Sequence, residues 1–137
     1  MNEPQDIMNL HKTLVKSKLY IFPNKGKINI SNKRGVYIIY DSSGRVLHVG
    51  NTPSGKGGLN QRLYNHVTHK SSFSRLYLRP REISLRNYYG FRIVEVDSPR
   101  KRVLLEALTA GLLCPAHIGT GEKKKEQIKA LPLKSTT

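Results

Sequence analysis

Two short apolar runs stand on either side of a turn-forming tetrapeptide. The runs are GVYIIY at 35–40 and RVLHVG at 45–50, and the DSSG between them favours a tight reversal, so the pattern predicts a β-hairpin. With a symmetric loop, Tyr37 faces His48 on one sheet face with Cβ atoms roughly 5 Å apart, and the plain interpretation is a polar pair on a solvated face. A three-residue loop with a bulge would shift this register by one residue and break the pairing.

Helical spacing of apolar residues marks three further segments. Helices are expected within 6–20, 58–70 and 98–117, the last with Ser98 as its N-cap and Pro115 ending the pattern. The run FRIVEV at 91–96 predicts a third strand. The segment 71–84 is ambiguous, because Pro80 argues against a continuous element. No internal repeat is visible, and 137 residues suit one domain with a modest core.

The charge balance points to a polyanionic partner. Lys and Arg number 24 against 9 for Asp and Glu, which gives a formal charge of +15. Nucleic acid is the leading candidate, because each neutralised phosphate releases counterions. A membrane surface is disfavoured, since a basic amphipathic membrane helix needs Trp or Phe on its apolar face and the chain has no Trp and 3 Phe.

Other compositional features narrow the class of protein. The single cysteine, Cys114, excludes an internal disulfide and a multi-cysteine zinc site. No charged start is followed by a long apolar segment, so neither a signal peptide nor a membrane span is expected. We therefore expect an intracellular protein, in the cytoplasm or associated with the nucleoid.

Among the few acidic residues, Glu106 is the one whose position asks for an explanation. It lies in RVLLEALTAGLL, a helix that is apolar on nearly every side, where a carboxylate is costly without a partner. One interpretation is a surface pair with Arg102, one turn earlier. The other is a ligand for a hard cation, since Mg²⁺ typically takes one or two carboxylates and completes its shell with water and substrate phosphate.

Phosphodiester cleavage with one metal ion would need a base, a cation and a metal ligand. Tyr37 or His48 could supply the base, and Arg62 the cation that stabilises the charged transition state. His66 could add a hydrogen-bonding group, and because it follows Arg62 by four residues, the two side chains should point together. Glu106 would bind the metal.

The ordered set of motifs resembles the GIY-YIG nuclease superfamily. GVY at 35–37, HVG at 48–50, RLYNH at 62–66 and the in-helix Glu106 follow the order of that family over residues 34–118. The resemblance implies an α+β fold with a small three-stranded antiparallel sheet flanked by helices. Residues 1–33 would form an N-terminal helical extension, and 119–137 a basic C-terminal tail.

The resemblance also implies a metal-dependent DNA endonuclease with one Mg²⁺ or Mn²⁺ ion per site. Tyr37 would be the first-motif tyrosine and a base for the attacking water, Arg62 the helix arginine, and Glu106 the sole metal-ligating glutamate. His66 matches a histidine that some members carry, and His48 would line the cleavage site. The nucleic acid is expected to contact basic residues near these motifs, namely Arg34, Lys56, Lys70 and Arg75.

Two departures from the family pattern keep an alternative open. The second motif usually begins with Tyr and here begins with His48, and the Asn that often follows the glutamate helix is absent, with only His117 in its place. The alternative is a catalytically weakened binding module with the same fold. An unrelated RNA-binding protein is a third possibility, RNA is not excluded as a substrate, and cleavage of both strands would need a homodimer or two successive encounters.

Overall fold

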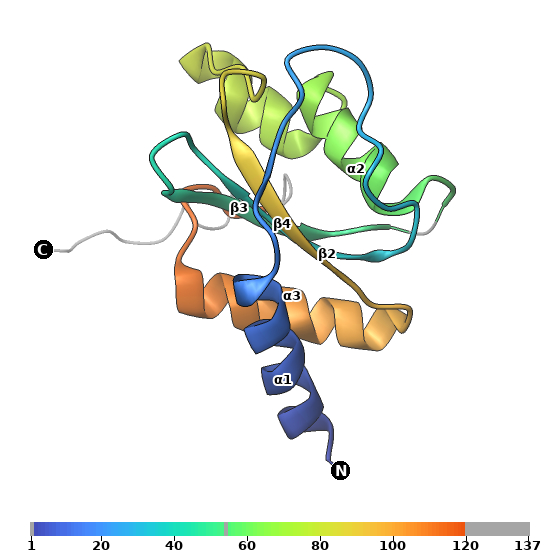
Figure 1. Ribbon diagram of the computed structural model, residues 1–137. Helices are drawn as coiled ribbons and strands as arrows, with labels where there is room; N and C mark the ends of the chain where they lie inside the picture. The colour runs from blue at the N-terminus through green and yellow to red at the C-terminus, as the bar shows by residue number, and fades with distance from the viewer. Residues whose placement is uncertain (1, 54, 120–137) are drawn as a thin grey trace, which may run out of the picture.

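The computed structural model describes residues 2–53 and 55–119, which form a sheet between two helical layers (Figure 1). The elements are α1 (Glu3–Lys16), β1 (Tyr20–Ile21), β2 (Gly35–Tyr40), β3 (Val46–Asn51), α2 (Gly58–Val67), β4 (Gly90–Glu95) and α3 (Pro99–Leu113). The antiparallel sheet has the strand order β1-β4-β2-β3. Helix α2 lies on one face of the sheet, and α3 and α1 lie on the other (Figure 1).

The predicted α+β class, with an antiparallel sheet flanked by helices, is confirmed, but the sheet has four strands rather than three. The additional strand is β1, which pairs Tyr20 with Phe91 and Ile21 with Gly90 on β4. A strand of two residues is too short to show an alternating hydrophobic pattern, so the sequence does not predict it. The Tyr20 ring also stacks on that of Phe91, with centroids 5.5 Å apart, which places the segment after α1 against the sheet.

The predicted hairpin is confirmed, but its predicted register is wrong. Tyr37 lies opposite Gly50, and His48 lies opposite Ile39, because the loop has three residues and a bulge follows it between Ile39 and Tyr40. The two irregularities together move the partner of Tyr37 by two positions. A shift of two preserves the face of the sheet to which a side chain points, so Tyr37 and His48 still share a face, with ring centroids 6.0 Å apart.

Strand β2 is buried on both faces because helices cover each side of the sheet. Tyr37 and Ile39 point toward α2, where they pack with Leu59 and Leu63. Ile38 belongs to the second cluster, on the side of α3 and α1. The polar hydroxyl of Tyr37 is thereby drawn into an apolar layer.

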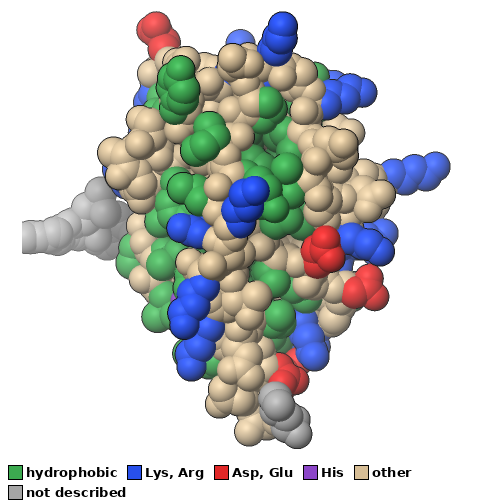
Figure 2. All heavy atoms as spheres, in the orientation of Figure 1, with side chains coloured by type: hydrophobic (Ala, Val, Ile, Leu, Met, Phe, Trp, Pro, Cys, Tyr) green, Lys and Arg blue, Asp and Glu red, His purple; other side chains and the backbone are tan. Residues whose placement is uncertain are grey.

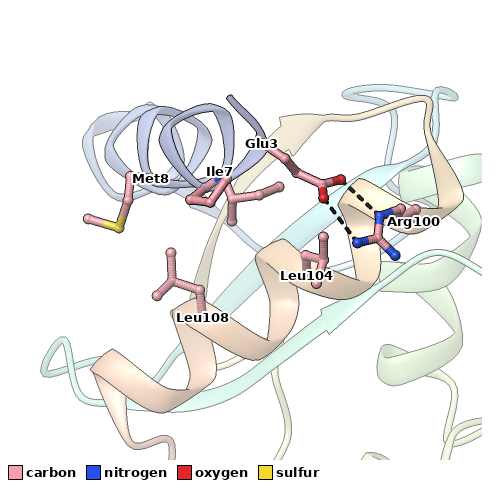
Figure 3. A pocket seen from close by; sticks show the side chains of 7 residues that line it. Glu3, Ile7, Met8, Arg100, Leu104 and Leu108 are labelled. Atoms are coloured by element: carbon pink, nitrogen blue, oxygen red, sulfur yellow. Dashed lines mark hydrogen bonds and ion pairs between the residues drawn. The ribbon is translucent and has the colours of Figure 1, made fainter. Parts of the chain in front are cut away.

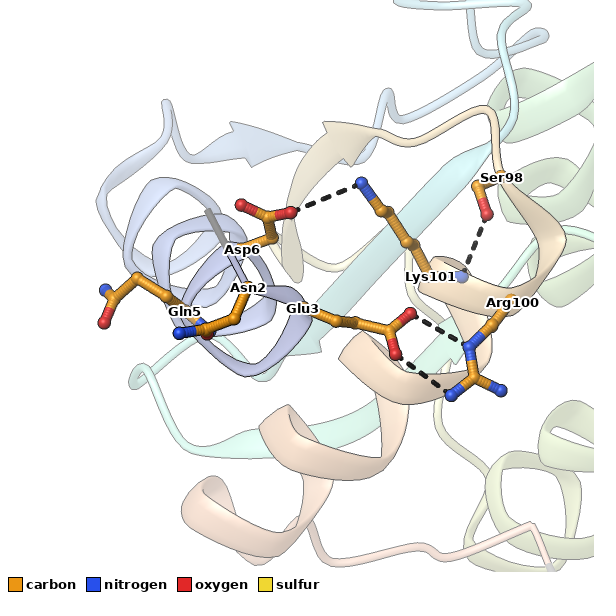
Figure 4. Close-up of polar contacts among 7 residues, drawn as sticks. All are labelled: Asn2, Glu3, Gln5, Asp6, Ser98, Arg100 and Lys101. Carbon is orange, nitrogen blue, oxygen red and sulfur yellow. Dashed lines mark hydrogen bonds and ion pairs between the residues drawn. The ribbon is translucent and has the colours of Figure 1, made fainter.

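Helix α1 is held to α3 by an apolar seam with charged groups at its rim (Figures 3 and 4). Leu14 is fully buried, and His11 Nδ1 lies 2.9 Å from Thr109 Oγ1 inside the seam. At the rim, both Glu3 oxygens accept hydrogen bonds from Arg100, at 2.9 and 3.0 Å. The helices leave an open groove of about 340 Å³ beside Glu3, lined mainly by apolar side chains (Figure 3).

Several local signals in the sequence have the expected structural outcome. The Ser98 side chain accepts a hydrogen bond from the backbone of Lys101 and caps α3 (Figure 4), which ends before Pro115. The ambiguous segment contains a π-helical turn at Ser74–Leu78, followed by a 3-10 turn that includes Pro80. No helix in the described part of the chain is long and apolar enough to cross a membrane. Of the tail predicted at 119–137, all but Gly119 lies outside the described residues.

Candidate active site

The Tyr37 hydroxyl is the meeting point of two side chains from α2. Arg62 Nε donates a hydrogen bond to it at 3.3 Å, and His66 Nε2 lies 2.6 Å from it. Arg62 and His66 are one helical turn apart and reach the same oxygen, which confirms the prediction that they point together. Three of the predicted site residues therefore form one hydrogen-bonded cluster between the sheet and α2.

Burial determines the protonation state of this cluster. Burial raises the pKa of Tyr37 to about 12, aided by the charge of Glu106 and opposed by Arg62. Burial also holds the pKa of His66 well below its ordinary value, and the neighbouring charges of His48, Arg62 and His117 add to the effect. At neutral pH the tyrosine is therefore a protonated phenol and the histidine a neutral imidazole.

His48 has different partners from those of Tyr37. Its ring stacks on Phe73, with centroids 4.4 Å apart and planes within 7°, and its Nδ1 atom lies 3.2 Å from Nδ1 of His117. Burial lowers the pKa of His48 to about 3, with His117 and Arg62 as further causes. The sequence left the base open between Tyr37 and His48, and it is Tyr37 that directly contacts the cation from α2.

Glu106 approaches the site from α3, on the opposite face of the sheet from α2. Its side chain is half-buried, and its Oε1 atom accepts a hydrogen bond from the side-chain amide of Asn51, at the end of β3. Burial raises the pKa of Glu106, whereas the Asn51 hydrogen bond and the charge of Arg62 act to lower it. The carboxylate therefore lies within the electrostatic range of both Arg62 and Tyr37.

The surface pair between Glu106 and Arg102 that the sequence left open is not formed. The Arg102 side chain is buried, and its Nη1 atom donates to the carbonyl oxygens of Val96 at 3.1 Å and Asp97 at 2.7 Å. In the described part of the chain, the ion pairs of α3 involve Arg100 and Lys101 instead. The first alternative for Glu106 is therefore wrong, and its partner is an amide.

The described residues fit only a metal site that has a single protein carboxylate as its ligand. Within residues 2–53 and 55–119, no group of three or more His, Cys, Asp or Glu side chains could hold a metal ion. A site built from protein ligands alone is therefore not available in this part of the chain. Glu106 offers one carboxylate with hard oxygen donors, which fits Mg²⁺ or Mn²⁺ held by that carboxylate together with water and substrate phosphate.

The four basic residues expected to contact nucleic acid are all exposed, but they lie on separate segments. Arg34 precedes β2, Lys70 follows α2, and Arg75 lies on the π-helical turn. Lys56 is the one that joins the site, because it lines a cavity of about 190 Å³ together with Arg62. Elsewhere the charge is diffuse, and on the face shown in Figure 2 the Lys and Arg side chains are scattered.

Sequence reasoning missed several residues that complete the site. Asn51 holds Glu106, Ser71 and Ser74 contact His66, and Phe73 supports His48. The position of Asn51 directly after HVG was a usable signal, since it is a polar residue at the end of a predicted strand that carries candidate site residues. The serines gave no such signal, because their segment was ambiguous.

No protein-family model matches the chain, and the curated proteins contain no match to it. The candidate site is thus defined by its geometry alone: a buried hydroxyl bound by an arginine and a histidine, with a carboxylate on a second helix within their electrostatic range.

Proposed function

We propose that this protein is a metal-dependent endonuclease of the GIY-YIG type that hydrolyses phosphodiester bonds in DNA with one Mg²⁺ or Mn²⁺ ion per site. The observation that carries the proposal is the convergence of Arg62 and His66 on the Tyr37 hydroxyl. Glu106 reaches the same region from a helix distant in sequence, and the formal charge of +15 suits a polyanionic substrate.

In the proposed reaction, water attacks phosphorus while Tyr37 accepts one of its protons. The new P–O bond forms as the bond to the leaving oxygen breaks. The leaving oxygen takes a proton from solvent water, His66 later returns its extra proton to solvent, and the products are a phosphate monoester and an alcohol. Tyr37 is a protonated phenol at neutral pH, so it can accept a proton only as its own proton passes to Nε2 of His66, 2.6 Å away. The Arg62 guanidinium stabilises the negative charge that develops on the phosphoryl oxygens.

Glu106 is the residue that would hold the metal ion. The ion would supply Lewis-acid stabilisation of the phosphate and of the leaving oxygen. Asn51 keeps one carboxylate oxygen of Glu106 oriented by donating to it. In this proposal the side chains from α2 serve proton transfer and charge stabilisation, and Glu106 from α3 serves metal binding within electrostatic range of them.

Substrate binding has to open the site. The Tyr37 side chain is 0% exposed, so water reaches its hydroxyl only when a covering group moves. Arg62 is the partly exposed one of the two side chains bonded to that oxygen, and it already lines a cavity with Lys56. We infer that a phosphate in this cavity draws Arg62 off the hydroxyl and admits the water.

A second candidate function is a nucleic-acid-binding module that keeps the fold without turnover. The full burial of Tyr37 favours it, as does the direct contact between His48 and His117, the two positions that depart from the family pattern. In that case the cluster on α2 serves only to stabilise the fold. This candidate predicts salt-sensitive binding that is independent of Mg²⁺.

The deciding experiment incubates supercoiled plasmid with the purified protein in Mg²⁺ and in EDTA. Glu106→Gln is compared with Glu82→Gln, which makes the same charge change on an exposed turn. Nicking or linearisation that needs both Mg²⁺ and Glu106, and survives in Glu82→Gln, supports the nuclease. Intact plasmid that is nonetheless retarded on a gel supports the binding module. Parallel single-stranded DNA and RNA substrates define the substrate class, and linear product indicates cutting of both strands.

A further inference from the structure

The turn that follows α2 folds the chain back onto His66. The amide of Lys70 donates to the carbonyl of Asn65 at 2.8 Å, and His69 adopts a left-handed conformation with φ of 63°, which together close the helix. The reversal places Ser71 Oγ 2.6 Å from Nδ1 of His66, on the side of the imidazole ring away from Tyr37. His66, Ser71 and Ser74 are all buried.

The donor and the acceptor of each hydrogen bond around Nδ1 of His66 can be deduced by starting from Ser74. The Ser74 hydroxyl donates its one proton to the carbonyl oxygen of His66, because a carbonyl can only accept. The Ser71 hydroxyl, 3.2 Å from Ser74 Oγ, must then donate its own proton to that oxygen. Ser71 Oγ also accepts a hydrogen bond from the backbone N–H of Ser74. Because its own proton goes to Ser74 Oγ, Ser71 Oγ can only accept the hydrogen bond that it shares with Nδ1 of His66. Nδ1 of His66 therefore carries a proton.

The hydrogen bonds of the Tyr37 hydroxyl independently indicate the same tautomer of His66. Among the hydrogen bonds of the described residues, the Tyr37 hydroxyl has Arg62 and His66 as its partners. A guanidinium only donates, so the proton of the buried hydroxyl has Nε2 of His66 as its acceptor. Nε2 must therefore be unprotonated, which is the tautomer that the hydrogen bonds of Ser71 require.

We propose that Ser71, itself fixed by Ser74, is a positioning residue that holds His66 in its Nδ1–H tautomer and so leaves Nε2 free to take the Tyr37 proton. The catalytic consequence rests on the proposed function, whereas the tautomer itself does not. In the opposite tautomer, Nε2–H would donate to Tyr37, the hydroxyl proton would lose its acceptor, and Ser71 and Ser74 would face each other without a proton between them. Proton transfer from Tyr37 to His66 would then be blocked.

The tautomer is measured directly from the ring ¹⁵N resonances of ¹⁵N-histidine-labelled protein. Signals of His66 are assigned by their loss in His66→Gln. The proposal expects a protonated Nδ1 and an unprotonated Nε2 in the unaltered protein. It expects this preference to weaken to a mixture of tautomers in Ser71→Ala, where only the Tyr37 hydroxyl still favours it, and to be kept in Ser72→Ala, a matched change at the exposed neighbouring serine. A protonated Nε2 in the unaltered protein would overturn the proposal, even if Ser71→Ala failed to fold.

Cleavage assays then test the catalytic consequence. With Mg²⁺ and plasmid, Ser71→Ala is expected to lose about 100-fold in rate and to change its pH profile, whereas Ser72→Ala keeps both. The groups that face His66 and affect that profile are Tyr37, His48, Arg62 and His117. A folded Ser71→Ala variant with altered tautomer and unchanged rate would refute the positioning role. Absence of cleavage by the unaltered protein would instead refute the proposed function, with the ¹⁵N result still deciding the tautomer.

Discussion

Gly50 stands directly across the β2–β3 ladder from Tyr37, and the tyrosine side chain occupies the space that a side chain at Gly50 would take. A Cβ atom at Gly50 would lie 2.5 Å from the Tyr37 hydroxyl oxygen and 3.1 Å from Nε2 of His48. The presence of glycine at the third position of the HVG motif therefore has a steric explanation. It lets the tyrosine ring lie across the strand, so that the hydroxyl reaches α2.

Gly50→Ala tests this relationship. The Tyr37 side chain is fully buried and its hydroxyl is held by two hydrogen bonds, so it cannot move aside freely. We expect a loss of about 1–3 kcal/mol in the free energy of unfolding, measured by urea denaturation, and a displaced Tyr37 hydroxyl. The matched control is Gly111→Ala in α3, where nothing lies within 4 Å of the new Cβ and a gain of about 0.5–1 kcal/mol is expected. Equal effects at the two positions would contradict the steric argument.

Asn51→Ala tests the support that Asn51 gives to Glu106, the proposed metal ligand. The Asn51 amide holds Glu106 and helps to lower its pKa, so its loss frees the carboxylate and raises that pKa further. Because groups that hydrogen-bond a metal-ligating side chain typically contribute about 10–100-fold to metal affinity, we expect the Mg²⁺ concentration for half-maximal cleavage to rise by about tenfold. Asn87→Ala, at an exposed asparagine, serves as the control. An unchanged Mg²⁺ dependence would show that Asn51 does not contribute to metal binding.

Sequence periodicity was sufficient to locate the long elements and one pair of side chains in the candidate site. Arg62 and His66 could be paired because helical spacing fixes which side chains point together. The hairpin register could not be derived, since the turn residues alone fix neither the length of the loop nor the bulge between Ile39 and Tyr40. The partner of Glu106 was equally hidden, because local spacing suggested Arg102 and the actual partner, Asn51, is 55 positions away.

The attachment of α1 gives a prediction about stability. Leu14 is fully buried in the seam beneath the sheet, whereas the Glu3–Arg100 pair lies at its solvent-exposed rim (Figure 4). We expect Leu14→Ala to cost about 2–5 kcal/mol in the free energy of unfolding, because it leaves a cavity in the core. Arg100→Ala should change it little, since exposed ion pairs are screened by solvent. A larger loss in Arg100→Ala would show that the rim, not the seam, holds the helix.

The buried histidines predict a pH dependence of stability near neutrality. In the unfolded chain, His48 and His66 take up protons as the pH falls through 6.5, but burial keeps the pKa of His48 at about 3 in the folded protein and that of His66 well below 6.5. The unfolded state therefore binds more protons than the folded state in this range, and stability rises with pH. Between pH 7.5 and 5.5 we expect a loss of about 1 kcal/mol for each of the two histidines.

Urea denaturation at pH 5.5, 6.5 and 7.5 measures this dependence, and a variant assigns it. His48→Phe keeps an aromatic ring against Phe73 but cannot be protonated, so it should remove about half of the decrease. His69→Asn, at an exposed residue with a left-handed backbone that asparagine tolerates, should leave the dependence intact. Burial also lowers the pKa of His11, which adds to the dependence in the same direction in every variant. If stability were the same at pH 5.5 and 7.5, the buried imidazoles would take up protons in the folded protein as readily as in the unfolded chain. Nε2 of His66 would then be largely protonated at pH 5.5 and could not accept the Tyr37 proton there.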